Sequence, residues 1–471
     1  MDPFLFAHLR GVSSASAVFD FSSLARGIAI RDQMVRALML AQRLPPFLNS
    51  RFGGSIPRPV LIVGGGIAGI TAGVALAESG IRVHVFEKDP MPFPLQRNCR
   101  SRWIDPHQYD WPLDHWRQES FPLDQSLIRS VCASWTAGRA NTIVKNYWAP
   151  ALPLPNMLRR PNFQPMCEFF GGREVLIRGL NFDQKSLIYS VGNCDSSAGG
   201  LGDKSSEAVL YGEYSSVVLF GGFGKEITSA GSHSDGLRSP KFWETDSFEE
   251  LHSGKASAGA ESPVLLSGTG DGALQDLLRI TTRKKSARDV YLVLDAAGLA
   301  PDLARIQSAE LRLERTLNWQ DRRGSDLMVD RMREELHRVY LEEVQRVLAK
   351  AAATAVLEEL AANAPQQLIL VSRRQSFDCV YGLNHFLGLI LSEYLRTTLR
   401  LERLVGSDVR DVTPVADAPG VFRVTLSGPD AGSVVRDTRL VVLRHGMDSQ
   451  DLLTPEWPAP KVPRPFAPFH P

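Results

Sequence analysis

The sequence contains a glycine-rich turn whose residues could hold a diphosphate. Gly64, Gly66 and Gly69 have the spacing G-x-G-x-x-G, directly after the apolar run 60–63. In such a turn the first glycine permits a tight bend, the second lets a diphosphate approach the backbone, and the third lets a helix pack close to a sheet. The positively polarised N-terminus of that helix would face the phosphates. We therefore predict that a dinucleotide contacts the whole turn: Gly64, Gly65, Gly66, Ile67, Ala68 and Gly69.

A carboxylate follows at the position where a dinucleotide ribose needs an acceptor. Glu87 ends a second apolar run, residues 82–86, about 20 positions beyond the last glycine of the turn. Lys88 comes next and could contact the same ligand. Positioning these groups requires a buried strand over 60–63, a helix from about 67 to 80 and a second strand over 82–86. The alternative is a glycine turn in a doubly wound domain that holds no ligand.

Residues 60–87 resemble the FAD-binding domain of the flavoprotein superfamily that has two dinucleotide-binding domains. The matching letters are G-G-G-I-A-G-I-T-A-G, between the two apolar runs. Flavin monooxygenases, Baeyer–Villiger monooxygenases, N-hydroxylases and amine oxidases belong to this superfamily. The resemblance implies FAD bound without a covalent link, with Glu87 holding its adenosine ribose. It also implies a strand that ends near FAD before the second domain, a position that residues 216–220 and Gly221 occupy in this chain.

A second glycine turn follows the apolar run 263–267. Gly268, Gly270 and Gly272 resemble the turn of the nicotinamide-dinucleotide domain in flavin monooxygenases, which implies NADP or NAD as a second cofactor. Asp271 departs from the pattern, because a carboxylate in the turn repels a diphosphate unless it points away or accepts a hydrogen bond from a hydroxyl. The alternative is a Rossmann-like domain that packs but binds no nucleotide.

The choice between NADP and NAD depends on which segment forms the next strand. Residues 368–372 lead into Arg373, whose guanidinium group suits the 2′-phosphate of NADP. This choice makes the strongly helical stretch 300–362 an insertion. Residues 290–294 are the other candidate, and Asp295 at their end would suit the free 2′-hydroxyl of NAD.

The run 100–112 is unusually rich in arginine and aromatic residues. Arg100 and Arg102 could hold a diphosphate, and Trp103 could stack on a ring. His107 is a candidate general base. The alternative is that this run packs two domains together.

A late strand over 440–443 ends in two further candidates for catalysis, Arg444 and His445. Beside a flavin, a cation and an imidazole would stabilise the anionic reduced ring. The alternative is a structural pair whose hydrogen bonds are satisfied within the fold.

Composition excludes several classes of function. Of 471 residues, 53 are Lys or Arg and 52 are Asp or Glu, so the net charge of +1 provides no basic field for nucleic acid. The five cysteines form no C-x-x-C pair, which excludes a thioredoxin-like dithiol and favours a reducing compartment. The sequence has no metal-binding, hydrolase or kinase motif. No apolar run has the length of a membrane helix, so we expect a cytoplasmic protein that does not span a membrane.

We predict an α/β protein with two Rossmann-type domains. The expected order is a helical extension, an FAD-binding domain, a second nucleotide-binding-like domain with the helical insertion, and a proline-rich tail, over 1–56, 57–262, 263–447 and 448–471. We also expect one helix from about 124 to 148 and a β-meander over 405–446.

The expected function is that of an FAD-dependent oxidoreductase that takes electrons from NAD(P)H and acts on a small organic substrate. Both the monooxygenase and the dehydrogenase type fit the resemblance. The alternative is a non-catalytic dinucleotide sensor or interaction scaffold. In either case the N-terminal segment and the helices of 300–362 offer surface to a protein partner or to a second copy of the chain.

Overall fold

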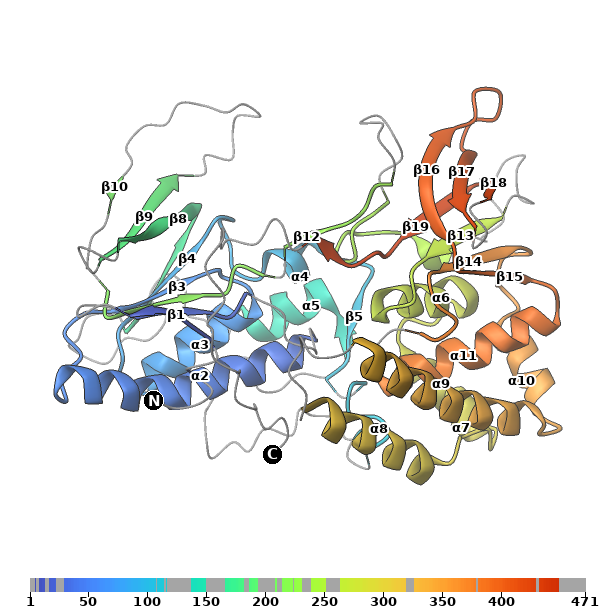
Figure 1. Cartoon of the computed structure of the whole chain (residues 1–471), viewed down its shortest axis with the longest axis horizontal. Helices are drawn as coiled ribbons and strands as arrows, with labels where there is room; N and C mark the ends of the chain where they lie inside the picture. Colours follow the sequence, from blue (N-terminus) through green and yellow to red (C-terminus); the bar gives the residue numbers. More distant parts are fainter. Residues whose placement is uncertain are drawn as a thin grey trace. The chain divides into compact units, whose positions relative to one another are not determined.

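The computed structural model describes residues 5, 8–12, 17–22, 29–106, 108–113, 116, 137–149, 166–181, 186–193, 208–209, 214–222, 224–230, 239–250, 263–318, 326–377, 380–428 and 432–448. The chain divides into two compact units. The first comprises Met1–Cys99, Ser120–Lys225 and Met447–Pro471, and the second comprises Arg100–Glu119 and Glu226–Gly446. Each unit contains a mainly parallel sheet with packed helices (Figure 1). The predicted α/β fold with two Rossmann-type domains is confirmed.

The first unit is built on a six-stranded sheet with the order β1-β2-β11-β3-β4-β7. Neighbouring strands are parallel except for β1 and β2. Every residue of β2, β3 and β11 is buried, as expected for strands covered on both faces. The strands are β1 (Leu9–Val12), β2 (Ala17–Asp20), β3 (Val60–Val63), β4 (Val83–Glu87), β7 (Cys167–Gly171) and β11 (Ser216–Leu219).

Two long helices of the first unit, α2 (Ile30–Phe52) and α3 (Ile67–Glu78), pack together on one side of this sheet (Figure 1). Because α3 lies between the sheet and α2, all its residues from Ile67 to Ala77 are buried. Of the helix predicted from about 124 to 148, residues 140–148 are helical (α5 and η2), residues 138–139 form the strand β6, and residues 124–136 lie outside the described part. The remaining elements are α4 (Pro94–Asn98), β6 (Gly138–Arg139), α5 (Ala140–Ile143), the π-helix η2 (Val144–Trp148), β8 (Arg173–Asn181), β9 (Ser186–Asn193) and β10 (Ala208–Val209).

The N-terminal segment belongs to the sheet of the first unit. β2 pairs in parallel with β11, with Val18 opposite Val217, so the prediction of a separate helical extension is wrong for β1 and β2. The run 17–20 is short and apolar, and it covers an edge of β11 that would otherwise leave backbone groups unpaired. α2 is helical as predicted, and it packs against α3 within the same unit.

The second unit is built on a four-stranded parallel sheet with the order β15-β14-β13-β19. Among the described residues, five helices lie between β13 and β14 in the sequence, and α11 connects β14 to β15. The elements are β13 (Val264–Ser267), α6 (Asp271–Thr282), α7 (Ala287–Ala296), α8 (Leu303–Asn318), α9 (Asp326–Leu348), α10 (Ala353–Leu360), β14 (Leu368–Ser372), α11 (Gly382–Thr397), β15 (Leu401–Val405) and β19 (Leu440–Leu443).

The two faces of this second sheet are covered differently. Val264 and Leu266 of β13 belong to a large core that they share with the helices. Leu265, which points the other way, belongs to a smaller core with Val424 of the antiparallel sheet β16-β17-β18. The β-meander predicted over 405–446 is thus present over residues 408–438 and covers the face that the helices leave free, whereas residues 440–443 join the parallel sheet as β19. The remaining elements are β5 (Trp103–Ile104), β12 (Lys225–Glu226), η3 (Phe248–Glu250), β16 (Asp408–Pro414), β17 (Phe422–Ser427), β18 (Ser433–Thr438) and β20 (Met447–Asp448).

The structure decides which segment follows the second glycine turn in the sheet. β14 pairs with β13 in register, with Val371 opposite Ser267, so the strand predicted over 368–372 is confirmed together with the helical insertion. The alternative strand over 290–294 is wrong, because these residues lie in α7. Val290 and Leu294 are buried on one face of that helix, and Ser286 caps its N-terminus by accepting a hydrogen bond from Asp289 N.

Two histidines form a buried pair within the helices of the second unit. His337 of α9 and His385 of α11 lie 3.0 Å apart between Nδ1 and Nε2, and the ring of Tyr340 stacks on His385. Phe377 N also approaches His337 Nδ1 at 3.4 Å, so this nitrogen is placed to accept. Burial lowers the pKa of His337 to about 4, and the positive charge of Arg403 acts in the same direction.

We expect the free energy of unfolding to fall as the pH is lowered from about 6.5 to about 4. In the unfolded chain His337 takes up a proton near its ordinary pKa, whereas in the folded chain it does so only at about 4. The contribution of neutral His337 to the free energy of unfolding is fully present above the pKa that this residue has in the unfolded chain. Below that pKa the contribution is lost progressively, by about 3 kcal/mol at pH 4. Denaturant titrations across this range measure the loss. In His337→Gln the loss should be smaller by about that amount, and equal pH dependence in both proteins would contradict this assignment.

Candidate dinucleotide-binding site

The first glycine turn is closed on all sides but one. Gly64 has a φ of +109°, and a side chain there would collide with the carbonyl of Phe220. A side chain at Gly69 would collide with the carbonyl oxygen of Gly64, because α3 starts pressed against the turn. Gly66, at the N-terminus of α3, has no heavy atom of the described chain within 4 Å of a Cβ built there, apart from its chain neighbours. A diphosphate therefore has room to approach at Gly66.

The first backbone amides of α3, like those of every helix, have no hydrogen-bond acceptor within the helix. The first intrahelical hydrogen bond of α3 runs from Ile70 N to Gly66 O at 3.0 Å. The amides of Ile67, Ala68 and Gly69 precede it, so they have no acceptor within the helix. These are the donors that a bound anion would satisfy.

The carboxylate of Glu87 folds against this turn at the end of β4. Its Oε2 accepts a hydrogen bond from Gly65 N at 2.5 Å, and its Oε1 accepts one from Asp89 N at 3.0 Å. Burial raises the pKa of Glu87, whereas these two backbone hydrogen bonds favour its charged form. Each oxygen keeps a second lone pair, so the carboxylate can still accept hydrogen bonds from a diol. A side chain at Gly65 would press on Glu87 and on Phe169, which explains the glycine at that position.

Arg97 is a cation beside the first turn that the sequence motif did not single out. Phe93 N donates to Gly65 O at 2.9 Å, and Arg97 N donates to Phe93 O one helical turn later. The Nε of Arg97 donates to Pro92 O, but its buried Nη2 has no hydrogen-bond partner among the described residues. Burial lowers the pKa of Arg97. The sequence could have indicated this residue, because Arg97 is an arginine shortly after Glu87, but the run 100–112 is denser in arginine and obscured it.

Two further residues of the first unit, Lys88 and Gly221, were also predicted to contact the dinucleotide. Lys88 is exposed at the end of β4. Gly221 follows Phe220, whose backbone N donates to Val63 O at 2.8 Å and whose carbonyl lies beside Gly64 of the turn. The amide of Gly221 donates to Ser22 Oγ at 3.0 Å and is thus engaged by the N-terminal segment.

The second glycine turn repeats the geometry of the first. Gly268 has a φ of +126°, and a side chain there would collide with the carbonyl of Arg444, as one at Gly64 would with that of Phe220. Gly270 caps the N-terminus of α6 and has open space at its Cβ position, as Gly66 has in the first turn. Gly272 lies against the ring of Phe242: a Cβ built on Gly272 would be 3.2 Å from a carbon of that ring.

Asp271 points away from the open side of the second turn. Its Oδ1 accepts hydrogen bonds from Tyr381 N at 3.0 Å and from Asn384 Nδ2 at 2.8 Å. Both donors lie at the N-terminus of α11, so this carboxylate caps a neighbouring helix. The departure from the motif therefore leaves the amides of the turn accessible to a diphosphate.

The end of β14 differs from the end of β4 in charge. The registers place Phe86 opposite Val63 and Val371 opposite Ser267, so Ser372 occupies the position that Glu87 has in the first unit. The next residue, Arg373, has a side chain that is 74 % exposed and forms an ion pair with Asp408. The second site thus offers a hydroxyl where the first offers a carboxylate, and an exposed cation follows in both, Arg373 and Lys88.

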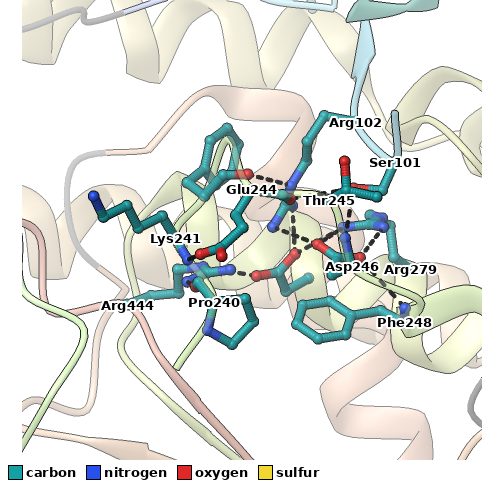
Figure 2. Close-up of polar contacts among 12 residues, drawn as sticks. Ser101, Arg102, Pro240, Lys241, Glu244, Thr245, Asp246, Phe248, Arg279 and Arg444 are labelled. Carbon is teal, nitrogen blue, oxygen red and sulfur yellow. Dashed lines mark hydrogen bonds and ion pairs between the residues drawn. The ribbon is translucent and has the colours of Figure 1, made fainter. Parts of the chain in front are cut away.

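A buried cluster of arginines and carboxylates lies beside the second turn. Arg444 Nε donates to Asp276 Oδ2 at 2.7 Å, and Arg102 Nη1 donates to Asp276 Oδ1. Arg279 donates to Asp246 Oδ1 at 2.6 Å (Figure 2). Burial alone would raise the pKa of Asp276, but the three arginines outweigh it and hold that pKa below its ordinary value. The cluster assigns Arg102 and Arg444 to the structure of the second unit.

The same cluster explains where the second unit begins. Asp246 and Glu249 are both bound by Arg279 of α6, so the segment 239–250 packs with the second unit although the predicted boundary lies at 262. Arg102 brings residues 100–106 into this unit in the same way.

The remaining predicted residues are also placed in the second unit. His445 Nε2 lies 2.8 Å from Ser267 Oγ, and burial lowers the pKa of His445. Arg100 is exposed, and its backbone N donates to Thr245 Oγ1. Trp103 is half-buried, with Lys285 over its ring. His107 lies outside the described residues.

Within the described ranges the structure contains no cluster of three or more His, Cys, Asp or Glu side chains that could hold a metal ion. Among these residues we also find no helix with the length and apolarity needed to cross a bilayer.

The family model described as an NAD(P)-binding Rossmann-like domain matches residues 62–122, which include the first glycine turn and Glu87. No curated protein matches the chain. Three similar solved structures are thioredoxin reductase from Lactococcus lactis (10 % identity, TM-score 0.34), bacillithiol disulfide reductase Bdr from Bacillus cereus (11 %, 0.42) and the cadaverine monooxygenase DfoA from Erwinia amylovora (12 %, 0.36). Each match covers 83 % of this chain and 78 % of the other. Similarity at this level does not carry an activity over.

We expect the glycines of the first turn to differ sharply in their tolerance of a methyl group. Gly69→Ala should lower the free energy of unfolding by about 2 to 3 kcal/mol, because its Cβ collides with backbone. Gly66→Ala should change it by less than about 1 kcal/mol, because the site is open. Chemical unfolding of both variants measures the difference, and equal effects would show that the turn is not closed as described.

Proposed function

We propose that this chain is an FAD-dependent oxidoreductase that takes electrons from NAD(P)H and acts on a small organic substrate. The observation that supports the proposal best is the repetition of one turn geometry in two units. In each unit a glycine at the helix N-terminus, Gly66 or Gly270, has open space beside the first amides of a helix, which have no acceptor within that helix. Two such sites suit two dinucleotides.

In the first unit, three kinds of group fit FAD. The amides after Gly66 would bind its diphosphate, Arg97 would add a positive charge, and Glu87 would accept hydrogen bonds from the adenosine ribose. The unpartnered Nη2 of Arg97 fits this assignment, because burying an unsatisfied donor is costly unless a ligand completes it. FAD, when bound, supplies hydride exchange at the flavin, and the chain supplies binding, orientation and exclusion of water.

In the second unit, the charge at the end of β14 favours NADPH over NADH. A carboxylate at the position of Ser372 would repel a 2′-phosphate, and Arg373 offers it a bidentate partner once the exposed ion pair with Asp408 opens. NADPH binding at this turn supports the monooxygenase type by resemblance. If NADPH does not bind at this turn, a dehydrogenase in which the flavin oxidises the organic substrate directly is favoured.

We expect Gly66→Asp to abolish flavin retention while leaving the chain folded. The side chain enters open space but brings a negative charge to the diphosphate position. The measurement is the yellow flavin absorbance of the purified protein, with mass identification of the ligand released on denaturation. Circular dichroism checks the fold.

Gly270→Asp is the matched control, because it makes the same change at the second turn. This variant should keep its flavin and lose bleaching of the flavin by NADPH. A colourless wild-type protein that binds nucleotide without turnover would favour the non-catalytic sensor or scaffold. Flavin retained by Gly66→Asp would remove the first turn from the proposal.

We expect Arg373→Ala to weaken NADPH binding by about tenfold and to leave NADH binding unchanged, because only NADPH carries the 2′-phosphate. Ser372→Glu should disfavour NADPH further and allow NADH. Dissociation constants for both nucleotides, measured by their fluorescence, give the comparison. Arg410→Ala, an exposed cation on β16, is the control. An equal loss for both nucleotides would show that Arg373 does not contact the 2′-phosphate.

A further inference from the structure

A pocket of about 440 Å³ lies at the far end of α6 from the second glycine turn. The 12 residues of α6 separate it from Gly270 by about 18 Å. The pocket belongs entirely to the second unit and is lined by Trp103, Arg283, Lys284, Lys285, Asp289 and Leu292. It is therefore separate from the proposed nucleotide sites.

Three consecutive cations give this pocket its charge. Arg283, Lys284 and Lys285 face a single acid, Asp289, so the lining has a net charge of two positive units. In the described part of the chain none of the three cations forms an ion pair with a carboxylate. Most other arginines of the second unit do form such pairs, among them Arg279, Arg305 and Arg444. Unpaired, converging cations provide the field that an anion needs.

The backbone fixes these cations in place. Arg283 ends α6 with a φ of +55°, its backbone N–H donates to Arg279 O, and its Nε is buried without a hydrogen-bond partner in the described structure. Lys284 N donates to Thr282 Oγ1. Lys285 directly precedes Ser286, the N-cap of α7, so the positive end of that helix adds to the field.

The other side of the pocket is apolar and aromatic. Leu292 is 44 % exposed, and Lys285 Nζ lies over the half-buried indole of Trp103, 5.4 Å from the centroid of the ring. The neighbouring residue Arg102 is locked by Asp276 and by the carbonyl of Phe242, which holds Trp103 in position. A fixed indole next to cations is suited to a planar ring that carries a negative charge.

We propose that this pocket binds a phosphate monoester carried on a planar ring, as a site additional to the two nucleotide turns. A dianionic phosphate matches the net charge of the lining. Arg283, Lys284 and Lys285 would donate hydrogen bonds to its oxygens, while Trp103 and Leu292 would contact the ring. Each unpaired donor of the pocket, including the buried Nε of Arg283, then has a use.

Phenyl phosphate is the probe for this proposal, with inorganic phosphate and phenol as its two halves. Calorimetric titration of the full-length protein should show phenyl phosphate binding at least about tenfold more tightly than either half. Binding of phenyl phosphate to the wild-type protein should weaken steeply as salt is added. Lys284→Ala/Lys285→Ala should weaken that binding by about tenfold or more and make it less sensitive to salt. In Trp103→Leu the affinity for phenyl phosphate should fall to that for inorganic phosphate. Trp103→Phe should keep most of the difference in affinity between the two probes.

Controls separate this pocket from the rest of the molecule. Arg331→Ala/Arg410→Ala removes two exposed cations from α9 and β16 and should leave phenyl phosphate binding unchanged. Gly270→Asp should also leave it unchanged, which distinguishes this site from the proposed nucleotide site. Unchanged binding in Lys284→Ala/Lys285→Ala, with circular dichroism showing a folded chain, would overturn the proposal. Equal affinity for phenyl phosphate and inorganic phosphate in the wild-type protein would overturn the part assigned to Trp103.

Discussion

The carbonyl oxygen of Gly64 occupies the space in which a side chain at position 69 would begin. This contact brings the first turn of α3 onto the end of β3, and it fixes where the free amides of the helix are presented. Glu87 reaches Gly65 N only because the same turn has no side chain in the way. The candidate binding groups of the first unit thus depend on a steric constraint that three glycines satisfy.

The second unit satisfies the same constraint with different neighbours. Its turn lies against the carbonyl of Arg444, whose side chain is held by Asp276 of the helix that the turn begins. A buried charge cluster therefore supports the turn where the first unit uses the aromatic residue Phe220. Removing one member of such a cluster leaves a buried charge uncompensated, so the segments that supply Arg102 and Asp246 are integral to this unit.

Local pattern was sufficient where one segment carried the whole signal. The run 60–63, its glycines and Glu87 could be predicted because strand, turn and helix follow one another directly. The strand considered over 290–294 was wrong, because a short apolar run fits a strand or a helix equally well. In this segment only the N-cap at Ser286 favours the helix. Long-range partners could not be predicted. The sequence shows Arg102 but not that Asp276, 174 positions later, is its partner. It likewise gives no indication that Asp271 would turn towards α11.

The position of β11 has a consequence for how the nascent chain folds. β11 lies between β2 and β3 and pairs with both, and Ser216 Oγ donates to Ala17 O across 199 positions. The two earlier strands therefore have no bridge between them in the sheet until residues 216–219 have left the ribosome. During this interval β2 exposes apolar residues, including Val18 and Phe19, that the finished sheet buries. Sheet closure of this kind is slow, and until it occurs the apolar strands made before residue 216 are exposed to aggregation.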